Sequence, residues 1–380
     1  MKLAVLKEAE KAERRVPVSP DSIQRLRALG IEVVVQSGAG VEAGYSDEVL
    51  GDAGAAIAAN PADCLSGADI VCKVRAPTLP EAGLLPAGSA LVSFLPPTTE
   101  RSVIEQLVNR RISAFSFELV PRISRAQAMD ALSSQASISG YKAVLLGAAR
   151  LPKILPLQMT AAGTIAPARV LVMGAGVAGL QAIATARRLG AVVEATDVRP
   201  AVKEEVQSLG ATFVELELAA QVGEGGYASE QSEEFLAKQR ELIAQRIEQS
   251  DLVITTAAIP GRRAPILITK EVAARMRPGS VIVDLAADTG GNCELTRPGE
   301  EVVAGGVTIL GWKDLPATVP ATASQMLARN LAALIGHLVT DGKLVVDLED
   351  EITGAVLAVH AGEVRNRLLR ESFERREAVP

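Results

Sequence analysis

The chain has 380 residues, of which 48% are hydrophobic, 22% are charged and only 3% are aromatic, and its net charge is −6. This length exceeds a single ordinary hydrophobic core and predicts two domains, and the composition excludes a disordered chain. No basic tract with interleaved aromatic residues is present, which argues against a nucleic-acid partner.

The N-terminus, the uncharged stretches and the cysteines bear on where the protein resides. The first apolar run is too short for the core of a signal peptide, and acidic residues follow it at once. The longest uncharged stretch, residues 170–186, is interpreted as strand, turn and helix, because a membrane-spanning helix needs about 20 mainly apolar residues. Cys64, Cys72 and Cys293 lack the spacing of a metal site, so we expect buried reduced thiols, no bound metal and a cytoplasmic protein.

The first third of the chain alternates strand and helix patterns. Helices are predicted over residues 19–29 and 101–109. In the first of them Ser19 is the expected N-cap, Pro20 lies in the first turn and Gly30 follows the end. Short apolar or β-branched runs are predicted as strands at residues 3–6, 31–35, 70–74, 90–95 and 112–117. Strands separated by helices favour a parallel sheet.

A second series of strands follows a helical stretch at residues 124–149. Its members are predicted at residues 170–173, 192–196, 252–256, 281–285 and 307–310. A long apolar helix over residues 318–338 comes next, and a helix in this place often crosses back to the first domain. We therefore predict an α/β protein with two Rossmann-like, doubly wound parallel-sheet domains. Their predicted limits are residues 1–125 with 325–380 and residues 126–324.

Residues 169–200 carry the most informative motif, in which a strand, a glycine turn, a helix and a second strand ending in an acid follow in order. Gly174 permits the tight turn, Gly176 lets a pyrophosphate approach the backbone, and Gly179 lets the helix pack closely on its strand. The pyrophosphate then lies on free N–H groups at the helix N-terminus. Asp197, about 20 residues later, is placed to accept the adenosine ribose hydroxyls and to repel a 2′-phosphate. The motif therefore predicts NAD(H) rather than NADP(H).

Further residues are expected to line the same cofactor, because the carboxyl ends of neighbouring parallel strands face one crevice. These residues belong to the glycine turn, to the positions after the acid and to the later strand ends: Ala175, Val177, Val198, Arg199, Thr256, Ala257, Leu285 and Asp288. Two alternatives stay open. The strand ends could show ordinary turn chemistry, and Arg199 could pair with a 2′-phosphate.

The scarcity of histidine limits the chemistry. Hydride exchange with an alcohol, amino acid or carbonyl needs a proton donor or acceptor, most often a histidine. His337 and His360 both fall in late apolar segments and are interpreted as structural. Hydride exchange between two nicotinamides moves no substrate proton, so it requires only that two rings be held in contact and water excluded. Arg15 and Lys73 could still bind a substrate carboxylate, which keeps an amino-acid dehydrogenase open.

Residues 122–135, RISRAQAMDALSSQ, resemble the signature loop and helix of the NAD(H)-binding component of the proton-translocating NAD(P) transhydrogenases. Residues 7–20, the glycine turn and helix at 174–191, and residues 281–296 are similar to the same family. The resemblance covers nearly the whole chain. It implies a soluble, dimeric component that docks on membrane subunits and on an NADP(H)-binding component at the inner face of the cytoplasmic membrane.

The resemblance also implies the activity and its residues. Hydride would pass directly from NADH to NADP+ with Re/Si specificity, coupled to proton translocation and dependent on the partner subunits. Arg122, Gln127, Asp130 and Ser133 would be the catalytic residues that surround the nicotinamide end, and the last two, three positions apart, share a helix face. Tyr227 would lie at the tip of a mobile loop that closes over the nucleotide.

Alanine dehydrogenase is the related alternative. Its Arg and Lys ligands for pyruvate look retained as Arg15 and Lys73, but Pro96 stands where its catalytic His is expected, and a proline cannot transfer a proton. Two further interpretations stay open. One is an NAD-binding regulatory or scaffold protein without chemistry. The other takes residues 122–133 as a capped surface helix with a solvated charge pair.

Overall fold

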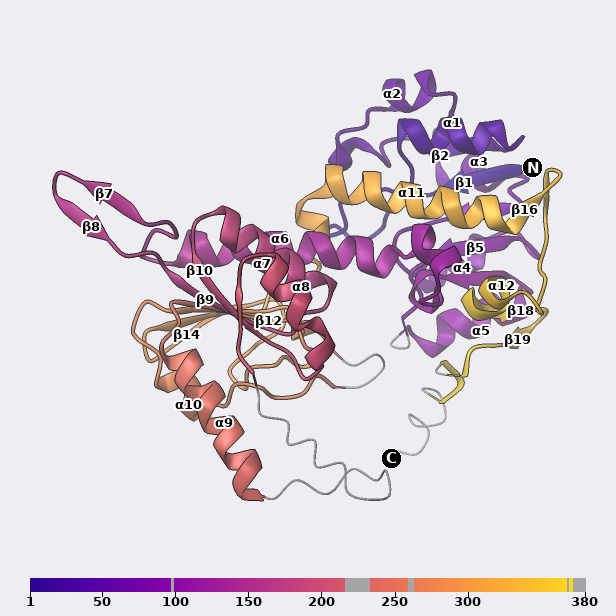
Figure 1. Ribbon diagram of the computed structural model, residues 1–380. Coiled ribbons are helices and arrows are strands. Elements are labelled where there is room, and N and C mark those ends of the chain that lie inside the picture. The colour runs from indigo at the N-terminus through magenta and orange to yellow at the C-terminus, as the bar shows by residue number, and fades with distance from the viewer. Residues whose placement is uncertain (97–98, 216–232, 259–262, 368, 372–380) are drawn as a thin grey trace. The chain divides into compact units, whose positions relative to one another are not determined.

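The computed structural model describes the chain except for residues 97–98, 216–232, 259–262, 368 and 372–380, and it divides into two compact units (Figure 1). The first unit contains residues 1–135 and 316–380, and the second contains residues 136–315. Each unit is built on a sheet of mainly parallel strands with helices packed on it. The predicted fold class is confirmed.

The first unit contains an eight-stranded sheet in the order β19-β18-β6-β5-β4-β1-β2-β3. Strands β1 to β6 are parallel and follow the 3-2-1-4-5-6 order of a doubly wound Rossmann sheet. Strands β18 and β19 continue the edge in antiparallel fashion, so the last described residues complete this sheet. The strands are β1 (Lys2–Val5), β2 (Glu32–Gln36), β3 (Ala56–Ala58), β4 (Ile70–Cys72), β5 (Ala90–Ser93), β6 (Ser113–Ser116), β18 (Leu357–His360) and β19 (Glu363–Val364).

Helices and a small hairpin surround this sheet, and the long helix α11 packs against α1 and η3. The α-helices are α1 (Pro20–Ala28), α2 (Asp47–Asp52), α3 (Pro61–Leu65), α4 (Leu79–Leu84), α5 (Arg101–Asn109), α11 (Pro320–Leu338) and α12 (Glu351–Val356). The 3₁₀ turns are η1 (Val41–Ala43), η2 (Phe117–Leu119), η3 (Ser124–Met129) and η6 (Leu315–Thr318), and the hairpin is β16 (Val339–Thr340) with β17 (Lys343–Leu344). Helix α6 (Ala131–Arg150) contains the boundary between the two units.

Both faces of the first sheet are buried, as a parallel sheet between helix layers requires. Successive residues of a strand point to opposite faces. Leu3 and Val5 accordingly belong to one hydrophobic cluster, which includes α11 residues, and Ala4 belongs to the other. This two-sided burial explains why the strands are continuous apolar runs in the sequence.

The second unit repeats the Rossmann order, with the seven-stranded sheet β11-β10-β9-β12-β13-β15-β14. Only β14 runs antiparallel, at one edge. The strands are β9 (Arg169–Met173), β10 (Val192–Thr196), β11 (Thr212–Phe213), β12 (Leu252–Thr255), β13 (Val281–Asp284), β14 (Glu301–Ala304) and β15 (Val307–Leu310). The helices are α7 (Val177–Arg188), α8 (Lys203–Ser208), α9 (Glu233–Glu248) and α10 (Lys270–Ala274), with 3₁₀ turns η4 (Pro200–Val202) and η5 (Ala287–Thr289). The strand order reverses between β9 and β12, which is where this fold binds ligands.

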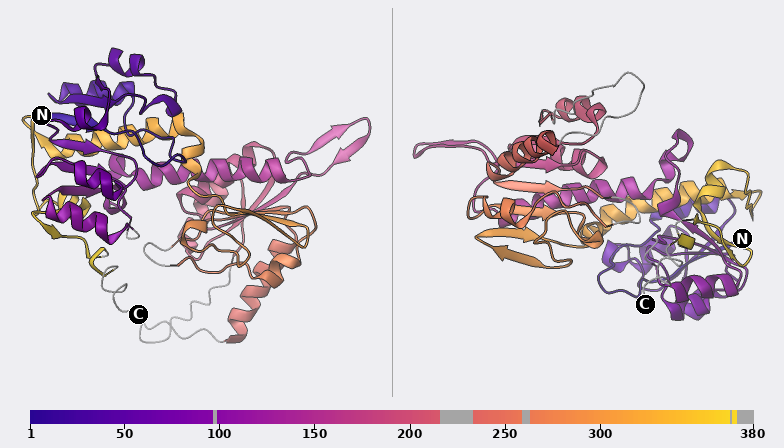
Figure 2. Two further views of the ribbon diagram at one scale, coloured as in Figure 1. Left: turned by 180° about the vertical axis from the view of Figure 1, so that it is seen from behind. Right: turned by 90° about the horizontal axis from the view of Figure 1, so that it is seen from below.

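An antiparallel hairpin, β7 (Gln158–Thr160) with β8 (Gly163–Ile165), protrudes from the second unit (Figure 2). All six strand residues are exposed, and Met159 has 75% of its surface accessible. A two-stranded hairpin without a packed face is marginally stable in water. Nothing in the predicted strand series anticipated this hairpin.

The predicted strands are all present, with ends within about two residues of the predicted limits. The Ser19 cap is confirmed, since its hydroxyl accepts the Ser22 amide and Pro20 begins α1. The strands that were not predicted are short, such as β3 and β11, or lie at the sheet edges, such as β14 and β19. Short edge strands carry too few alternating apolar residues to be recognised from the sequence.

The limits of the two units differ from the prediction by about ten residues on each side. Residues 126–135 and 316–324 belong to the first unit because they bond within it. Gln135 accepts a hydrogen bond from Arg15 and donates one to the Ala323 carbonyl. The Ser324 hydroxyl accepts the Val16 amide. These contacts join segments far apart in sequence and leave no local pattern.

Two further predictions concern cysteines and membrane spans. Cys64, Cys72 and Cys293 are buried free thiols, and burial raises the pKa of each above its ordinary value. Within the described part of the chain, no group of acidic, histidine or cysteine residues could hold a metal ion. The same residues include no helix long and apolar enough to cross a membrane.

Candidate functional site

The glycine turn after β9 has the geometry that the sequence motif predicts. Gly174 has φ +103°, and a Cβ there would lie 2.4 Å from Thr256 Oγ1. A Cβ at Gly179 would lie 1.8 Å from the Gly174 carbonyl oxygen, so only glycine lets α7 approach its strand so closely. A Cβ at Gly176 would meet no atom within 4 Å. The second glycine therefore faces open space, as expected where a ligand approaches the backbone.

The N-terminus of α7 is suited to an anion. Gly176 is the N-cap and its backbone is extended, no side chain caps the helix, and the first turn contains no acidic residue. The first N–H groups of a helix have no intrahelical acceptor, and the helix dipole is positive at this end. Val177, the first helical residue, is exposed. A phosphate placed above Gly176 would meet these free donors.

Asp197 follows the last residue of β10 and is tied directly to the turn. Its Oδ2 accepts the Ala175 amide at 2.7 Å, and its Oδ1 accepts the Arg199 amide at 2.8 Å. Burial alone would raise the pKa of this carboxyl, but the hydrogen bonds from the Arg199 side chain and from the two amides lower it below its usual value. The carboxylate is therefore ionised at neutral pH and held beside the glycine turn. Ala175 is itself buried, so it contributes its amide and not its side chain.

Arg199 pairs with Asp197 in this structure. Its Nε lies 3.0 Å from Oδ1 and its Nη2 lies 3.0 Å from Oδ2, although most of the arginine side chain is exposed. The alternative role of Arg199, pairing with a 2′-phosphate, would require that this ion pair be broken. Between them Val198 has 74% of its surface exposed, an apolar side chain next to the carboxylate. Such a side chain suits contact with an aromatic base.

The next strand ends reinforce the turn. The Thr256 hydroxyl, just after β12, lies 3.2 Å from the Gly174 carbonyl and 3.3 Å from the Met173 carbonyl. The Ala257 amide donates to the Asn292 Oδ1 at 3.1 Å, and Asn292 Nδ2 returns a bond to the Ala257 carbonyl at 2.8 Å. These contacts fix the backbone on both sides of the point where the strand order reverses.

Asp284 was not proposed from the sequence as a site residue, but it organises the loop after β13. Its buried carboxylate accepts the amides of Ala286, Asn292 and Cys293 and the hydroxyls of Thr255 and Thr296. An aspartate as the last residue of a buried strand was the available signal. Its five donors could not be identified without the fold, because four of them lie in the loop that Asp284 itself shapes.

The two predicted residues of this loop differ in environment. Leu285 packs against the hydrophobic core beside the sheet. Asp288, in η5, is exposed, and its Oδ1 lies 3.8 Å from Lys313 Nζ. Tyr227, predicted at the tip of a closing loop, lies outside the described residues.

The RISRAQAMDALSSQ segment forms η3, Asp130 and the first turn of α6 in the first unit. Asp130 Oδ1 accepts the Ser133 amide at 2.8 Å, and Oδ2 accepts the Ser133 hydroxyl at 2.5 Å. This is the geometry of a helix N-cap, so the capping part of the alternative interpretation is correct for this pair. Arg122 and Gln127 are exposed, and neither side chain has a polar partner among the described residues. The segment thus presents a guanidinium, an amide and a carboxylate of defined position.

Arg15 and Lys73, the pair shared with alanine dehydrogenases, are engaged within the protein. Arg15 is 7% exposed and forms a two-bonded ion pair with Glu13, at 2.7 and 2.6 Å. Lys73 is 1% exposed, and its Nζ lies 3.2 Å from Glu8 Oε2 and 2.8 Å from Glu81 Oε1. Burial raises the pKa of Glu8 despite Lys73, whereas Lys73 and its hydrogen bond lower the pKa of Glu81 despite burial.

No histidine lies at the carboxyl edge of the first sheet in the described residues. His360 Nδ1 lies 2.9 Å from the Ser113 hydroxyl, at the opposite, amino edge, because β18 runs antiparallel to β6. His337 Nε2 lies 2.8 Å from Asp350 Oδ2 near the end of α11. The two histidines are thus structural, as predicted. The loop after β5 instead carries Pro96, and Leu95 donates its amide to Glu118.

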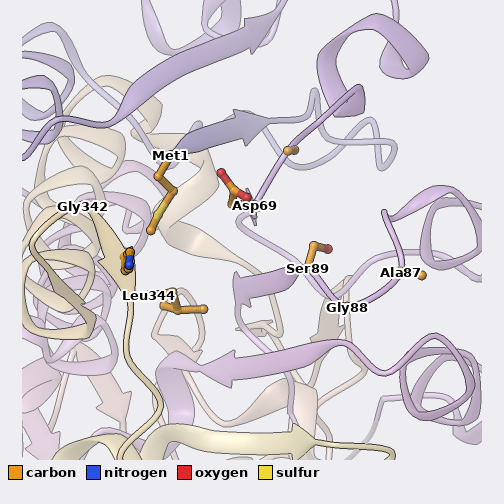
Figure 3. Close-up of a pocket in the computed structure, with 9 residues that line it drawn as sticks. Met1, Asp69, Ala87, Gly88, Ser89, Gly342 and Leu344 are labelled. Atoms are coloured by element: carbon orange, nitrogen blue, oxygen red, sulfur yellow. The ribbon is translucent and has the colours of Figure 1, made fainter.

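A cavity of about 500 Å³ opens at the amino edge of the first sheet (Figure 3). Met1, Asp69 and Ser89 line it, each at or just before the start of a strand. Ligands of Rossmann sheets bind at the carboxyl edge. The cavity therefore does not coincide with the candidate site.

The fold and the turn define a two-domain Rossmann protein whose second domain carries a complete dinucleotide-type phosphate turn. Residues 4–139 match the family model described as alanine dehydrogenase/PNT, N-terminal domain, and residues 143–367 match the C-terminal domain of the same family. The chain belongs to this alanine dehydrogenase/PNT family.

Individual relatives separate the two branches. The first portion of the two-part NAD(P) transhydrogenase subunit alpha of Rhodospirillum rubrum is 49% identical over 374 residues, which cover 96% of this chain and 97% of the relative. A solved transhydrogenase structure from Sinorhizobium meliloti matches with a TM-score of 0.87 and 42% identity, covering 96% of this chain and 100% of that one. A solved L-alanine dehydrogenase matches with a TM-score of 0.84 but 27% identity, covering 99% of each chain. The fold is common to both branches, and the sequence is more similar to the transhydrogenases.

Proposed function

We propose that this chain is the NAD(H)-binding subunit of a proton-translocating NAD(P) transhydrogenase. It binds NADH on the second domain and presents the dihydronicotinamide for direct hydride transfer to NADP+ held by a partner component. The observation that carries the proposal is the glycine turn closed by Asp197, on a chain 49% identical to a transhydrogenase alpha subunit. Pro96 favours this function over alanine oxidation.

The turn supports binding of the adenosine half of NADH. The pyrophosphate would lie above Gly176, on the free amides that begin α7. The ribose hydroxyls would donate to Asp197, which is ionised at neutral pH. A 2′-phosphate at the same place would meet a negative carboxylate, so NADPH is disfavoured. Val198 and Thr256 complete the surroundings of the adenosine and the turn.

The nicotinamide half is assigned to the first domain's signature segment. Arg122 and Gln127 offer exposed donors that have no described partner, and Asp130 with Ser133 offers a fixed acceptor and a hydroxyl. Such groups suit a carboxamide and a ribose. Tyr227 is proposed to close over the bound nucleotide.

The chemistry requires little of the chain beyond positioning. A hydride carries two electrons and one proton from NADH to NADP+, giving NAD+ and NADPH, so no separate proton moves on either substrate. The protein must therefore hold the donor ring, exclude water and leave its reactive face open to the acceptor. Arg15 and Lys73 do not serve as substrate ligands in this proposal, because Glu13, Glu8 and Glu81 neutralise them.

Partner subunits belong to the same proposal. We assign proton translocation to membrane subunits and NADP(H) binding to a separate component, with this chain attached through them at the inner face of the cytoplasmic membrane. We assign a second copy of the chain to the exposed β7–β8 hairpin, since Met159 and Ile165 leave apolar surface uncovered there. Analytical ultracentrifugation of a Met159→Lys variant should show a monomer where the unaltered chain is a dimer.

The experiment that tests the function uses the purified chain with and without its partners. The single Trp312, just after β15, gives an intrinsic fluorescence signal for NADH titration. We expect NADH binding, no oxidation of L-alanine by NAD+, and reduction of NADP+ by NADH once the NADP(H)-binding and membrane components are added. Steady alanine oxidation would support a dehydrogenase in which another group replaces the missing histidine. Binding without transfer in the full complex would support a regulatory NAD-binding protein.

A further inference from the structure

A buried chain of polar side chains connects the N-terminal loop of the first unit to η3. It begins at Glu13, which also accepts from Arg75 Nε at 3.0 Å, and passes to Arg15 through two short bonds. Arg15 Nη1 then donates to Gln135 Oε1 at 2.9 Å. Glu13 and Arg15 lie in the loop that follows β1, and Gln135 lies near the start of α6, so the network joins two distant segments of the chain.

The chain of bonds continues from α6 to α11 and ends on η3. Gln135 Nε2 lies 3.3 Å from the Ser134 hydroxyl, which donates to Asn330 Oδ1 at 2.7 Å. Asn330 Nδ2 in turn donates to the carbonyl of Ala128 at 2.8 Å. Ala128 lies in η3, between Gln127 and the helix-capping Asp130. The network therefore holds the backbone of the segment that carries the candidate nicotinamide ligands.

Burial makes this network costly to break. Glu13, Arg15, Gln135 and Asn330 are all more than nine-tenths buried. A buried polar group left without its partner costs about 1–3 kcal/mol, and more when it is charged. Asn330 satisfies two partners with one amide, which fixes its orientation and so the position of the Ala128 carbonyl. Ser134 is the bridge, since its hydroxyl contacts both Gln135 and Asn330.

We propose that Ser134 and Asn330, supported by Arg15 through Gln135, are positioning residues that set the geometry of Gln127 and Asp130 for hydride transfer. The inference rests on the proposed function. None of the four network residues needs to touch the nucleotide; they act through the Ala128 backbone. Adenosine binding, on the other domain, does not depend on them. Their loss should therefore lower kcat in the complex more than it raises KM for NADH.

The test uses a matched series at one position. Ser134→Ala removes the bridging hydroxyl, and Ser134→Thr keeps it. Ser208→Ala is the control, because the Ser208 hydroxyl donates to a carbonyl three residues earlier, as Ser134 does to Ala131, but has no link to Asn330. Asn330→Asp is the second disrupting variant, since it keeps the acceptor for Ser134 and loses the donor to Ala128.

Two readouts are combined: hydride transfer from NADH to NADP+ in the reconstituted complex, and amide hydrogen exchange of residues 124–130 in the chain alone. For Ser134→Ala and Asn330→Asp we expect kcat about 10-fold lower, KM for NADH changed less than about 2-fold, and exchange about 10-fold faster. Ser134→Thr and Ser208→Ala should match the unaltered chain in both readouts.

Unchanged exchange in the two disrupting variants would overturn the positioning role. Faster exchange with an unchanged kcat would overturn its link to hydride transfer. Equal losses with Ser134→Thr would show that packing, and not the hydroxyl, is required. If the unaltered complex transfers no hydride, the proposed function fails and this inference fails with it, while the exchange data identify that failure as separate from the network.

Discussion

Asp197 offers the sharpest test of cofactor selection. Its two oxygens already accept four hydrogen bonds, from the Ala175 amide and from the amide, Nε and Nη2 of Arg199. A carboxylate offers about four acceptor sites. The ribose hydroxyls of NADH must therefore displace the Arg199 side chain, which is mostly exposed and so easily released.

The size of the effect follows from these contacts. Two hydrogen bonds to a charged acceptor contribute about 1.5–3 kcal/mol each, and losing an exposed ion pair costs about 0–1 kcal/mol. Allowing for water that replaces part of the loss, Asp197→Ala should weaken NADH binding by about 2–3 kcal/mol, or about 30- to 150-fold. The same change removes the repulsion of a 2′-phosphate and releases Arg199 to pair with it, so the preference for NADH over NADPH should narrow by at least that factor.

The assay is titration of Trp312 fluorescence with NADH and with NADPH. Asp197→Asn separates charge from geometry, because its amide oxygen can still accept the Ala175 amide. Asp251→Asn is the matched control, since Asp251 lies before β12 at the amino edge of the same sheet and bonds to Arg169 and Lys153. An unchanged NADH/NADPH preference in Asp197→Ala would refute the selective role of this carboxylate.

Three other predictions concern the turn, the capped segment and acid stability. Gly179→Ala should destabilise the second domain by about 1–3 kcal/mol, because its Cβ would clash with the Gly174 carbonyl, whereas Gly176→Ala should fold normally and weaken NADH binding; thermal unfolding and titration distinguish them. Asp130→Asn should keep most of the helix cap but lower hydride transfer in the complex about 10-fold, and full activity would contradict the assignment. Hydrogen bonds from the Thr353 amide and from His337 lower the pKa of Asp350, so its stabilising effect is present above about pH 4 and is lost as pH falls. The difference in Tm between the unaltered chain and Asp350→Ala, about 1 kcal/mol of capping at pH 7, should thus shrink in acid, and a constant difference would contradict this.

The sequence by itself determined the features that depend on neighbours along the chain. Strands such as β9 and β10 are apolar runs bounded by turn residues, and these patterns are local. Gly174, Gly176 and Gly179 were each assigned a different mechanical reason, and the structure shows a positive φ, an open approach and a close contact in that order. Asp197 was found because the strand that carries it ends one residue earlier.

The tertiary structure decided which charged and polar groups meet. Arg15 and Lys73 carry the same residue types whether they bind a substrate or Glu13 and Glu81, and only the folded chain shows that they bind the glutamates. Asp284 acquires its donors from a loop that it helps to form, and Asn330 reaches Ala128 across about 200 residues of chain. Local patterns arise from backbone geometry and burial, which repeat every few residues, whereas the pairing of polar groups depends on the crossing of distant segments and leaves no period in the sequence.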